Sequence, residues 1–127
     1  MTFDLAMPVL VVDDYKTVVR IICRLLKQAG FSNVDEATDG AEALSKLKER
    51  KYGLVISDWH MAPTSGVDLL RQAKADEQLR DVAFIMVSAE AAPENVALAK
   101  AEGANAYVVK PFDAQTLKAR IETALRS

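Results

Sequence analysis

The sequence has little of several features that mark special classes of protein. A single cysteine, Cys23, excludes an internal disulfide and favours a reducing compartment. Lys and Arg number 16 against 18 Asp and Glu, so the chain lacks the basic excess of a general nucleic-acid-binding protein. No apolar run approaches the roughly 20 residues that a membrane-spanning helix needs, and residues 1–7 lack the basic start of a signal peptide. These absences predict a cytoplasmic protein that binds neither nucleic acid nor membrane.

The length of 127 residues is close to the commonest size of one domain. Half of the residues are hydrophobic and 27% are charged, a composition typical of globular rather than disordered chains. We therefore expect a single domain over residues 1–127, with no room for a second, output domain, and a monomer.

Short, continuous apolar runs alternate along the chain with segments of helical period. Such runs predict strands that are buried on both faces, and a weaker run at residues 33–37 predicts an edge strand. Five strands that alternate with five helices predict a parallel sheet with helices on both faces, although periodicity leaves the strand order open. The four strong runs are residues 9–12, 54–56, 83–87 and 106–109.

The first helical segment follows residue 14 and ends at a glycine, Gly30, which suits a helix C-terminus. Its apolar positions predict one buried face with two flanking residues. The expected face is Val18, Ile22, Leu25 and Leu26, with Ile21 and Ala29 beside it.

Other helix boundaries carry their own signals. Asp39 and Glu42 have the spacing of a capping box. Pro93 suits the first turn of a helix, and Gly103 suits the end of the same helix.

Polar residues follow four of the buried runs at the point where each run ends. The carboxyl ends of parallel strands meet at one edge of a sheet, where ligands bind in a crevice. We therefore expect three carboxylates, one hydroxyl and one ammonium to converge there. These residues are Asp13, Asp14, Asp58, Ser88 and Lys110.

This set of groups indicates phosphoryl chemistry. Three neighbouring carboxylates repel one another, and Mg²⁺, which prefers oxygen ligands, relieves that repulsion. Lys110 suits a phosphoryl oxygen, and the hydroxyl of Ser88 can donate to another. The chain has no glycine-rich phosphate loop. A phosphoryl group attached covalently to a carboxylate, as an aspartyl phosphate, is therefore favoured over a bound nucleotide.

Motifs at these strand ends resemble the two-component receiver domain in order and in spacing, over residues 8–125. The likeness is greatest to stand-alone chemotaxis receivers of the CheY type, and it implies a flavodoxin-like (βα)5 doubly wound sheet with strand order 2-1-3-4-5. The motifs are Val11-Val12-Asp13-Asp14, Ile56-Ser57-Asp58-Trp59, Val87-Ser88-Ala89-Glu90 and Tyr107-Val108-Val109-Lys110-Pro111-Phe112.

The resemblance implies a role for each site residue. Asp58 is expected to accept the phosphoryl group, and Lys110 to bind it. Asp13, Asp14 and Asp58 are expected to bind Mg²⁺, with the backbone carbonyl of His60 as a further ligand.

The resemblance also implies a conformational switch. Ser88 and Tyr107 occupy the switch positions, and the bond between Lys110 and Pro111 is expected to be cis. Phosphorylation would then alter the face made by the fourth helix, fifth strand and fifth helix.

The implied function is phosphorylation-dependent signalling in chemotaxis. The implied partners are a chemotaxis-type histidine kinase, the flagellar motor switch or another output protein, and a phosphatase. One alternative is a phosphate sink or phosphorelay intermediate in another two-component pathway. Another is a Mg²⁺-dependent phosphatase, but His60 stands where such enzymes need a second acid. Apart from its own phosphorylation and dephosphorylation, we expect no enzymatic activity.

Two loops depart from the chemotaxis pattern. Chemotaxis receivers commonly have a proline four residues after the phosphoacceptor. Here Ala62 occupies that position and Pro63 follows one position later, so we expect this loop to run differently. Ala92 and Pro93 stand where enterobacterial chemotaxis receivers have two lysines.

Overall fold

The computed structural model describes residues 5–61, 64–89 and 92–126. Five parallel strands form one sheet in the order β2-β1-β3-β4-β5, which confirms the expected flavodoxin-like order. The strands are β1 (Val9–Val12), β2 (Val34–Ala37), β3 (Leu54–Asp58), β4 (Ala83–Ser88) and β5 (Ala106–Val109). The helices are α1 (Lys16–Gln28), α2 (Gly40–Glu49), α3 (Gly66–Ala75), α4 (Pro93–Ala101) and α5 (Ala114–Arg126).

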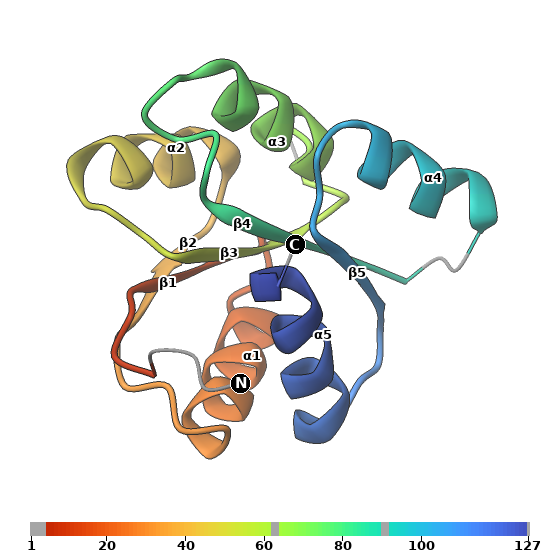
Figure 1. Ribbon diagram of the computed structural model, residues 1–127. Coiled ribbons are helices and arrows are strands. Elements are labelled where there is room, and N and C mark those ends of the chain that lie inside the picture. The colour runs from red at the N-terminus through yellow and green to blue at the C-terminus, as the bar shows by residue number, and fades with distance from the viewer. Residues whose placement is uncertain (1–4, 62–63, 90–91, 127) are drawn as a thin grey trace.

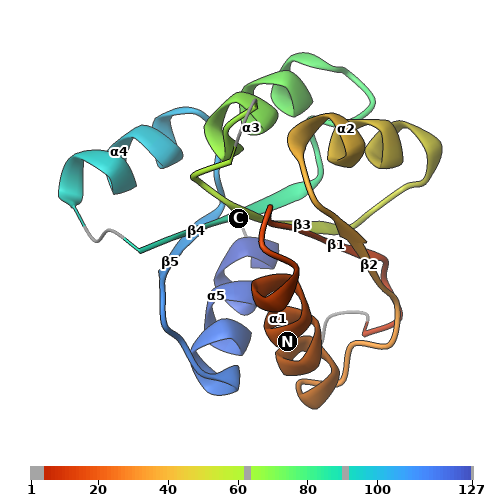
Figure 2. The same ribbon diagram turned by 180° about the vertical axis from the view of Figure 1, so that it is seen from behind.

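The helices cover both faces of the sheet. Figures 1 and 2 show α1 and α5 on one face and α2, α3 and α4 on the other. In the described part of the chain, no helix is long and apolar enough to cross a membrane.

Burial along the strands agrees with the prediction from the apolar runs. Every residue of β1, β3 and β4 is buried, whereas the edge strand β2 buries only its last residue, Ala37. Successive side chains of a central strand point to opposite faces, and helices cover both faces, so no position in these strands faces water.

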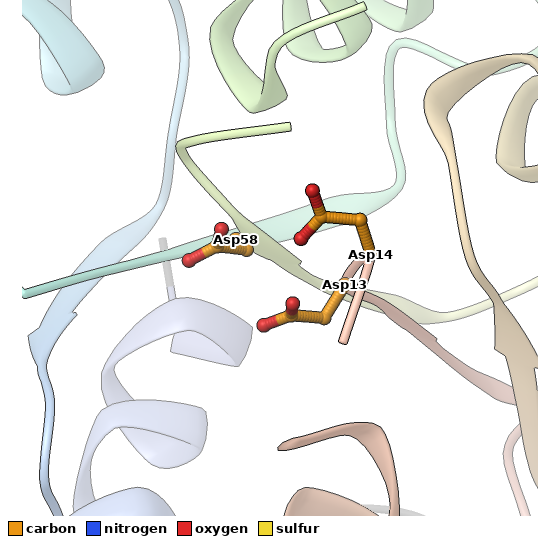
Figure 3. A group of neighbouring side chains, drawn as sticks. All are labelled: Asp13, Asp14 and Asp58. Atoms are coloured by element: carbon orange, nitrogen blue, oxygen red, sulfur yellow. The ribbon is translucent and has the colours of Figure 1, made fainter. Parts of the chain in front are cut away.

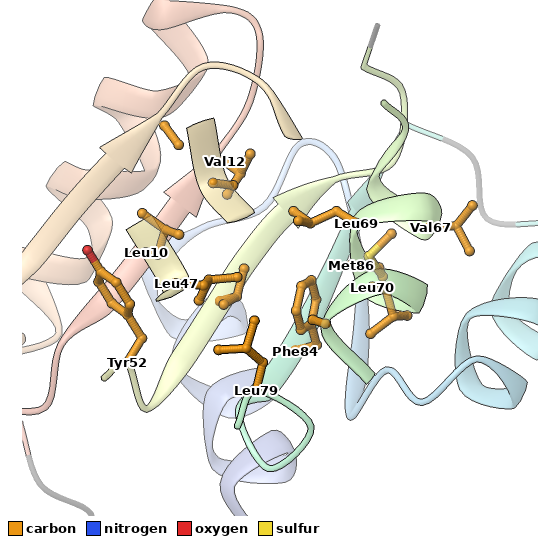
Figure 4. Close-up of a cluster of buried hydrophobic side chains, with 14 of the residues drawn as sticks. Leu10, Val12, Leu47, Tyr52, Val67, Leu69, Leu70, Leu79, Phe84 and Met86 are labelled. Atoms are coloured by element: carbon orange, nitrogen blue, oxygen red, sulfur yellow. The ribbon is translucent and has the colours of Figure 1, made fainter. Parts of the chain in front are cut away.

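Two hydrophobic clusters fill the space between the sheet and the helices on its two faces. The cluster beneath α2 and α3 contains Leu10, Leu70 and Phe84, which are among the buried side chains drawn in Figure 4. The cluster beneath α1 and α5 contains Ile56 and Ile121. Each cluster fixes its helices against the sheet, and so fixes the loops that leave the carboxyl ends of the strands.

The buried face of α1 differs from the predicted one. Val19, Ile22 and Leu26 are buried, whereas Ile21 is 50% exposed. Val19, Ile22 and Leu26 recur at helical spacing over the sheet, and Ile21 is turned by about 100° from Ile22 around the helix axis. Val18 and Leu25 are half-buried at the side of this face.

The expected helix boundaries are present. The Asp39 carboxylate accepts a hydrogen bond from the N–H of Glu42 at 2.7 Å. The Glu42 carboxylate reaches back one residue further than in a standard capping box, to the N–H of Thr38 at 2.7 Å. Gly30 and Gly103 follow their helices with φ of 103° and 107°, a left-handed conformation that favours glycine.

A hydrogen-bonded pair anchors the edge strand β2 to the start of β3. The Tyr52 hydroxyl donates to Asp35 Oδ2 at 2.6 Å, and Arg50 lies 2.6 Å from the same oxygen. The hydrogen bond from Tyr52, assisted by Arg50, lowers the pKa of Asp35. Burial and the contact with Asp35 raise the pKa of Tyr52 to about 12.

Tyr52→Phe should therefore lower the free energy of unfolding in a pH-dependent way. We expect a loss of about 1 kcal/mol near neutral pH, since a third of the Asp35 side chain is exposed to solvent. The folded pKa of Asp35 is below its unfolded value of about 4, so its stabilisation is present above that pH and is lost as the pH falls through the folded pKa. Urea unfolding should show a difference in the free energy of unfolding between Tyr52→Phe and the unaltered protein near neutral pH, and this difference should become smaller in acid. Tyr15→Phe, at an exposed tyrosine, is the control, and a gap that persists in strong acid would contradict the assignment.

Candidate functional site

Three carboxylates gather at the carboxyl ends of β1 and β3. Asp13 and Asp14 directly follow β1, and Asp58 is the last residue of β3. One oxygen from each lies within 4.8 Å of the others, and Figure 3 shows the three side chains converging. Asp13 is fully buried and Asp58 is 6% exposed, whereas Asp14 is exposed. The cluster is therefore open to solvent on the side of Asp14.

Lys110, which follows β5, completes the cluster. Its Nζ lies 2.8 Å from Asp58 Oδ1 and 3.2 Å from Asp13 Oδ2. Burial alone would lower the pKa of Lys110, but the hydrogen bond to Asp58 and the two carboxylate charges outweigh burial and raise the pKa. The ammonium therefore stays charged between the two acids. The bond between Lys110 and Pro111 is cis, as expected.

Asp13 is held in place from two sides. The N–H of Tyr15 donates to Asp13 Oδ1 at 3.0 Å, while Lys110 occupies Oδ2. Burial raises the pKa of Asp13, and the charge of Asp58 adds to this effect. A buried carboxylate with a raised pKa beside a second carboxylate is a site where additional positive charge would be stabilising.

Backbone hydrogen bonds join the strand ends that carry these groups. The N–H of Lys110 donates to the carbonyl of Ser88 at 2.8 Å, and the N–H of Trp59 donates to the carbonyl of Val87 at 2.9 Å. Backbone hydrogen bonds therefore connect the carboxyl ends of β3, β4 and β5 at the positions of Asp58 and Lys110.

Gly66, the first residue of α3, also shapes the site, and no prediction from sequence singled it out. Its N–H donates to the carbonyl of Trp59 at 2.8 Å. A Cβ atom at this position would lie 2.1 Å from the backbone oxygen of Asp58. The only signal in the sequence was its place directly after Ser65, which caps α3 by accepting from the N–H of Asp68.

The two residues expected to form a switch lie on adjacent strands. Ser88 is the last residue of β4 and is buried, one position beyond Val87, the partner of Asp58 in the sheet. Tyr107 on β5 is 9% exposed, and its ring meets Trp59 edge-on with 6.2 Å between centroids. The tyrosine ring is thus packed against the residue that follows Asp58.

The remaining sequence expectations concern loops around the site. His60 is exposed, two residues after Asp58. The departure at Ala62 and Pro63, and the motif residue Glu90, lie outside the described residues.

Comparison with known proteins gives one consistent result. The family model described as response regulator receiver domain matches residues 9–122. The chemotaxis protein CheY of Pseudomonas aeruginosa is 46% identical over 116 residues, which cover 91% of this chain and 94% of that protein. The chemotaxis protein CheY-3 of Vibrio cholerae is 43% identical over 116 residues, with 91% and 89% covered.

Solved structures are similar as well. The chemotaxis protein CheY4 of Vibrio cholerae, crystallised at low pH, has a TM-score of 0.88 and 31% identity, covering 94% of this chain and 99% of its own. A receiver domain protein from Clostridium thermocellum has a TM-score of 0.84 and 33% identity, with 94% of each chain covered.

Proposed function

This chain belongs to the response regulator receiver family, and we propose that it signals in chemotaxis by accepting a phosphoryl group on Asp58 from a histidine kinase. The observation that carries this proposal is the position of Lys110 Nζ, 2.8 Å from Asp58 Oδ1 inside a cluster of three carboxylates. The names of the relatives in Pseudomonas aeruginosa and Vibrio cholerae support the chemotaxis role.

The side chain of Asp58 is the nucleophile. One carboxylate oxygen forms a bond to phosphorus as the bond from phosphorus to the donor's histidine nitrogen breaks, and that nitrogen keeps the electron pair. The Lys110 ammonium, already hydrogen-bonded to Asp58, lies where it can neutralise a phosphoryl oxygen. In dephosphorylation, water attacks the same phosphorus and the Asp58 carboxylate leaves.

The carboxylates fit a Mg²⁺ ion. The site offers hard oxygen donors only, and the raised pKa of Asp13 indicates that additional positive charge would be stabilising there. Asp13, Asp14 and Asp58 would hold the ion, with the backbone carbonyl of His60 as a further ligand. When bound, Mg²⁺ supplies positive charge that neutralises the carboxylates and the oxygens of the incoming group.

The response to phosphorylation passes through Ser88 and Tyr107. The Ser88 hydroxyl would move toward the new phosphoryl oxygens, and the loop from β4 to α4 would follow it. Tyr107 packs on Trp59, beside the site, so a shift there changes the contacts of its ring. The face made by α4, β5 and α5 would then differ between two states, and an output protein such as the flagellar motor switch would bind one of them.

We therefore expect a phosphoryl mimic to affect residues far from Asp58. In ¹⁵N-labelled protein, beryllofluoride should shift amide signals of residues 89–112 as well as those near Asp58. Ser88→Ala should still accept phosphate but should lose the distant shifts, because its methyl group cannot bond to the phosphoryl oxygens.

Ser45→Ala, at an exposed serine of α2, is the matched control and should keep both effects. If beryllofluoride perturbs only the neighbours of Asp58, and partner affinity is the same with and without beryllofluoride, the proposed switch is contradicted. A passive phosphate sink would then be the better account.

A further inference from the structure

The first turn of α2 touches the loop that leads from Asp58 to α3. Gly40, the first residue of α2, is buried, and Thr64 of the loop lies directly against it. A Cβ atom at Gly40 would lie 2.7 Å from both Cβ and Cγ2 of Thr64, closer than Cβ atoms approach other atoms in proteins. Helices α2 and α3 lie side by side on this face of the sheet (Figures 1 and 2). The loop therefore comes this close to α2 only because position 40 has no side chain.

The backbone conformation at this position does not itself require glycine. The glycines with a left-handed φ are Gly30 and Gly103, so alanine could adopt the backbone of Gly40. Alanine is also the better helix former. The close approach of Thr64 is therefore the feature that excludes a larger residue at position 40.

The helix side of this contact is fixed. Asp39 caps α2 by accepting from the N–H of Glu42, and Ala43 is buried in the cluster beneath the helix. The carbonyl of Ala37, at the end of β2, accepts a hydrogen bond of 3.2 Å from the N–H of Asp13. The start of α2 is therefore held in place relative to the first acid of the site.

The α3 end of the loop is fixed as well. The N–H of Gly66 donates to the carbonyl of Trp59 at 2.8 Å, which closes the loop on itself. Gly66 is already packed on the backbone oxygen of Asp58, since a Cβ atom there would lie 2.1 Å from that oxygen. A displacement of Thr64 must therefore be taken up in the part of the loop that contains His60.

A hollow beside the contact gives Thr64 room to move. It lies between α2 and α3, has a volume of about 340 Å³, and is lined by Gly40, Leu44, Thr64 and Gln72 among others. A methyl group added at position 40 would therefore displace Thr64 and leave α2 in place.

We propose that Gly40 is a positioning residue for the Mg²⁺ site and acts through its contact with Thr64. The contact sets the spacing between Asp13, which is hydrogen-bonded to the end of β2, and the carbonyl of His60 in the loop. This inference rests on the proposed function, since it concerns the ion that the site is proposed to hold. Residues that orient metal ligands without binding the metal commonly contribute about tenfold or more to metal affinity.

The test measures Mg²⁺ affinity from the fluorescence of Trp59, which directly follows Asp58, without any phosphoryl donor. Gly40→Ala should weaken Mg²⁺ binding by about tenfold. Its circular dichroism spectrum and urea midpoint should match those of the parent protein, because alanine favours the helix. Gly53→Ala also brings a Cβ atom within 2.8 Å of a side chain, but before the start of β3. It is the matched control and should bind Mg²⁺ like the parent protein.

A second substitution identifies the contact as the cause. Thr64→Gly removes both atoms that the new Cβ atom would meet at 2.7 Å and leaves the backbone oxygen of Thr64 at 3.4 Å. In the Thr64→Gly background, Gly40→Ala should therefore change Mg²⁺ affinity by less than about twofold. The comparison is decisive even where Gly40→Ala alone does not fold, because the double variant relieves the overlap.

Spectra recorded without Mg²⁺ test the displacement of the loop directly. In ¹⁵N-labelled Gly40→Ala, amide signals of residues 59–66 should shift. Unchanged Mg²⁺ affinity in Gly40→Ala, or an equal loss in both Thr64 backgrounds, would overturn this inference and leave the proposed function intact. A parent protein that binds no Mg²⁺ would contradict the proposed Mg²⁺ site and this inference together.

Discussion

Asp58→Asn should acquire no phosphoryl group from acetyl phosphate, whereas the unaltered protein should acquire one. The amide is close in size and shape to the carboxylate but is not a nucleophile at neutral pH, so the chemistry is lost while the fold remains. Intact mass spectrometry measures the added group directly. EDTA should abolish labelling of the unaltered protein as completely as the substitution does. It removes Mg²⁺, and without that ion the carboxylates of the site repel the incoming phosphoryl oxygens.

The controls separate loss of the nucleophile from loss of the structure. Asp81→Asn changes an exposed acid away from the site and should be labelled like the parent protein. The free energy of unfolding of Asp58→Asn should change little, since loss of the ion pair with Lys110 is offset by removal of a charge that raises the pKa of buried Asp13. Labelling that persists in Asp58→Asn would exclude Asp58 as the phosphoacceptor.

Gly66→Ala should produce the largest loss of stability among small substitutions near the site. The new Cβ would lie 2.1 Å from the backbone oxygen of Asp58 and 2.9 Å from Met86 Cε, so either α3 or the end of β3 must shift. We expect the free energy of unfolding to fall by about 3 kcal/mol, the upper part of the range for overpacking. The rate of labelling by acetyl phosphate should fall too, because the shift displaces Asp58 relative to Lys110.

Gly53→Ala is the matched control for this effect. Its Cβ would meet the sulfur of Met7 at 2.8 Å, but that contact is with a flexible side chain that can turn away. Urea unfolding should therefore show a loss below about 1 kcal/mol for Gly53→Ala. Equal stability of the two variants would show that α3 moves freely, and would remove the reason for a glycine at position 66.

The fold could be predicted from sequence for the strands that are packed between two layers of helices. The runs at residues 9–12 and 106–109 match β1 and β5 to the residue, because these two strands contain only apolar residues. The face of α1 was less well predicted, because its apolar residues outnumber the positions that can contact the sheet. Ile21 is exposed and Val19 is buried, and only tertiary packing decides between them.

The candidate site was predicted as a set of residues but not as a geometry. Strand ends and parallel topology brought Asp13, Asp58 and Lys110 to one edge, and the distances of 2.8 and 3.2 Å agree with that reasoning. The role of Gly66 could not be predicted, because it depends on how closely α3 approaches the backbone of Asp58. Nor could the contact of Tyr107 with Trp59, which depends on two side-chain orientations across β4.

The ion pair between Lys110 and Asp13 spans 97 residues of sequence and joins β5 to β1, which are not neighbours in the sheet. A contact of such high sequence separation forms only when nearly the whole chain has folded. During synthesis the ribosome releases Asp13 and Asp58 long before Lys110, so a nascent chain has both carboxylates without the lysine that lies between them. Until Lys110 is in place, the chain lacks the cation that lies between Asp13 and Asp58 and offsets their charges.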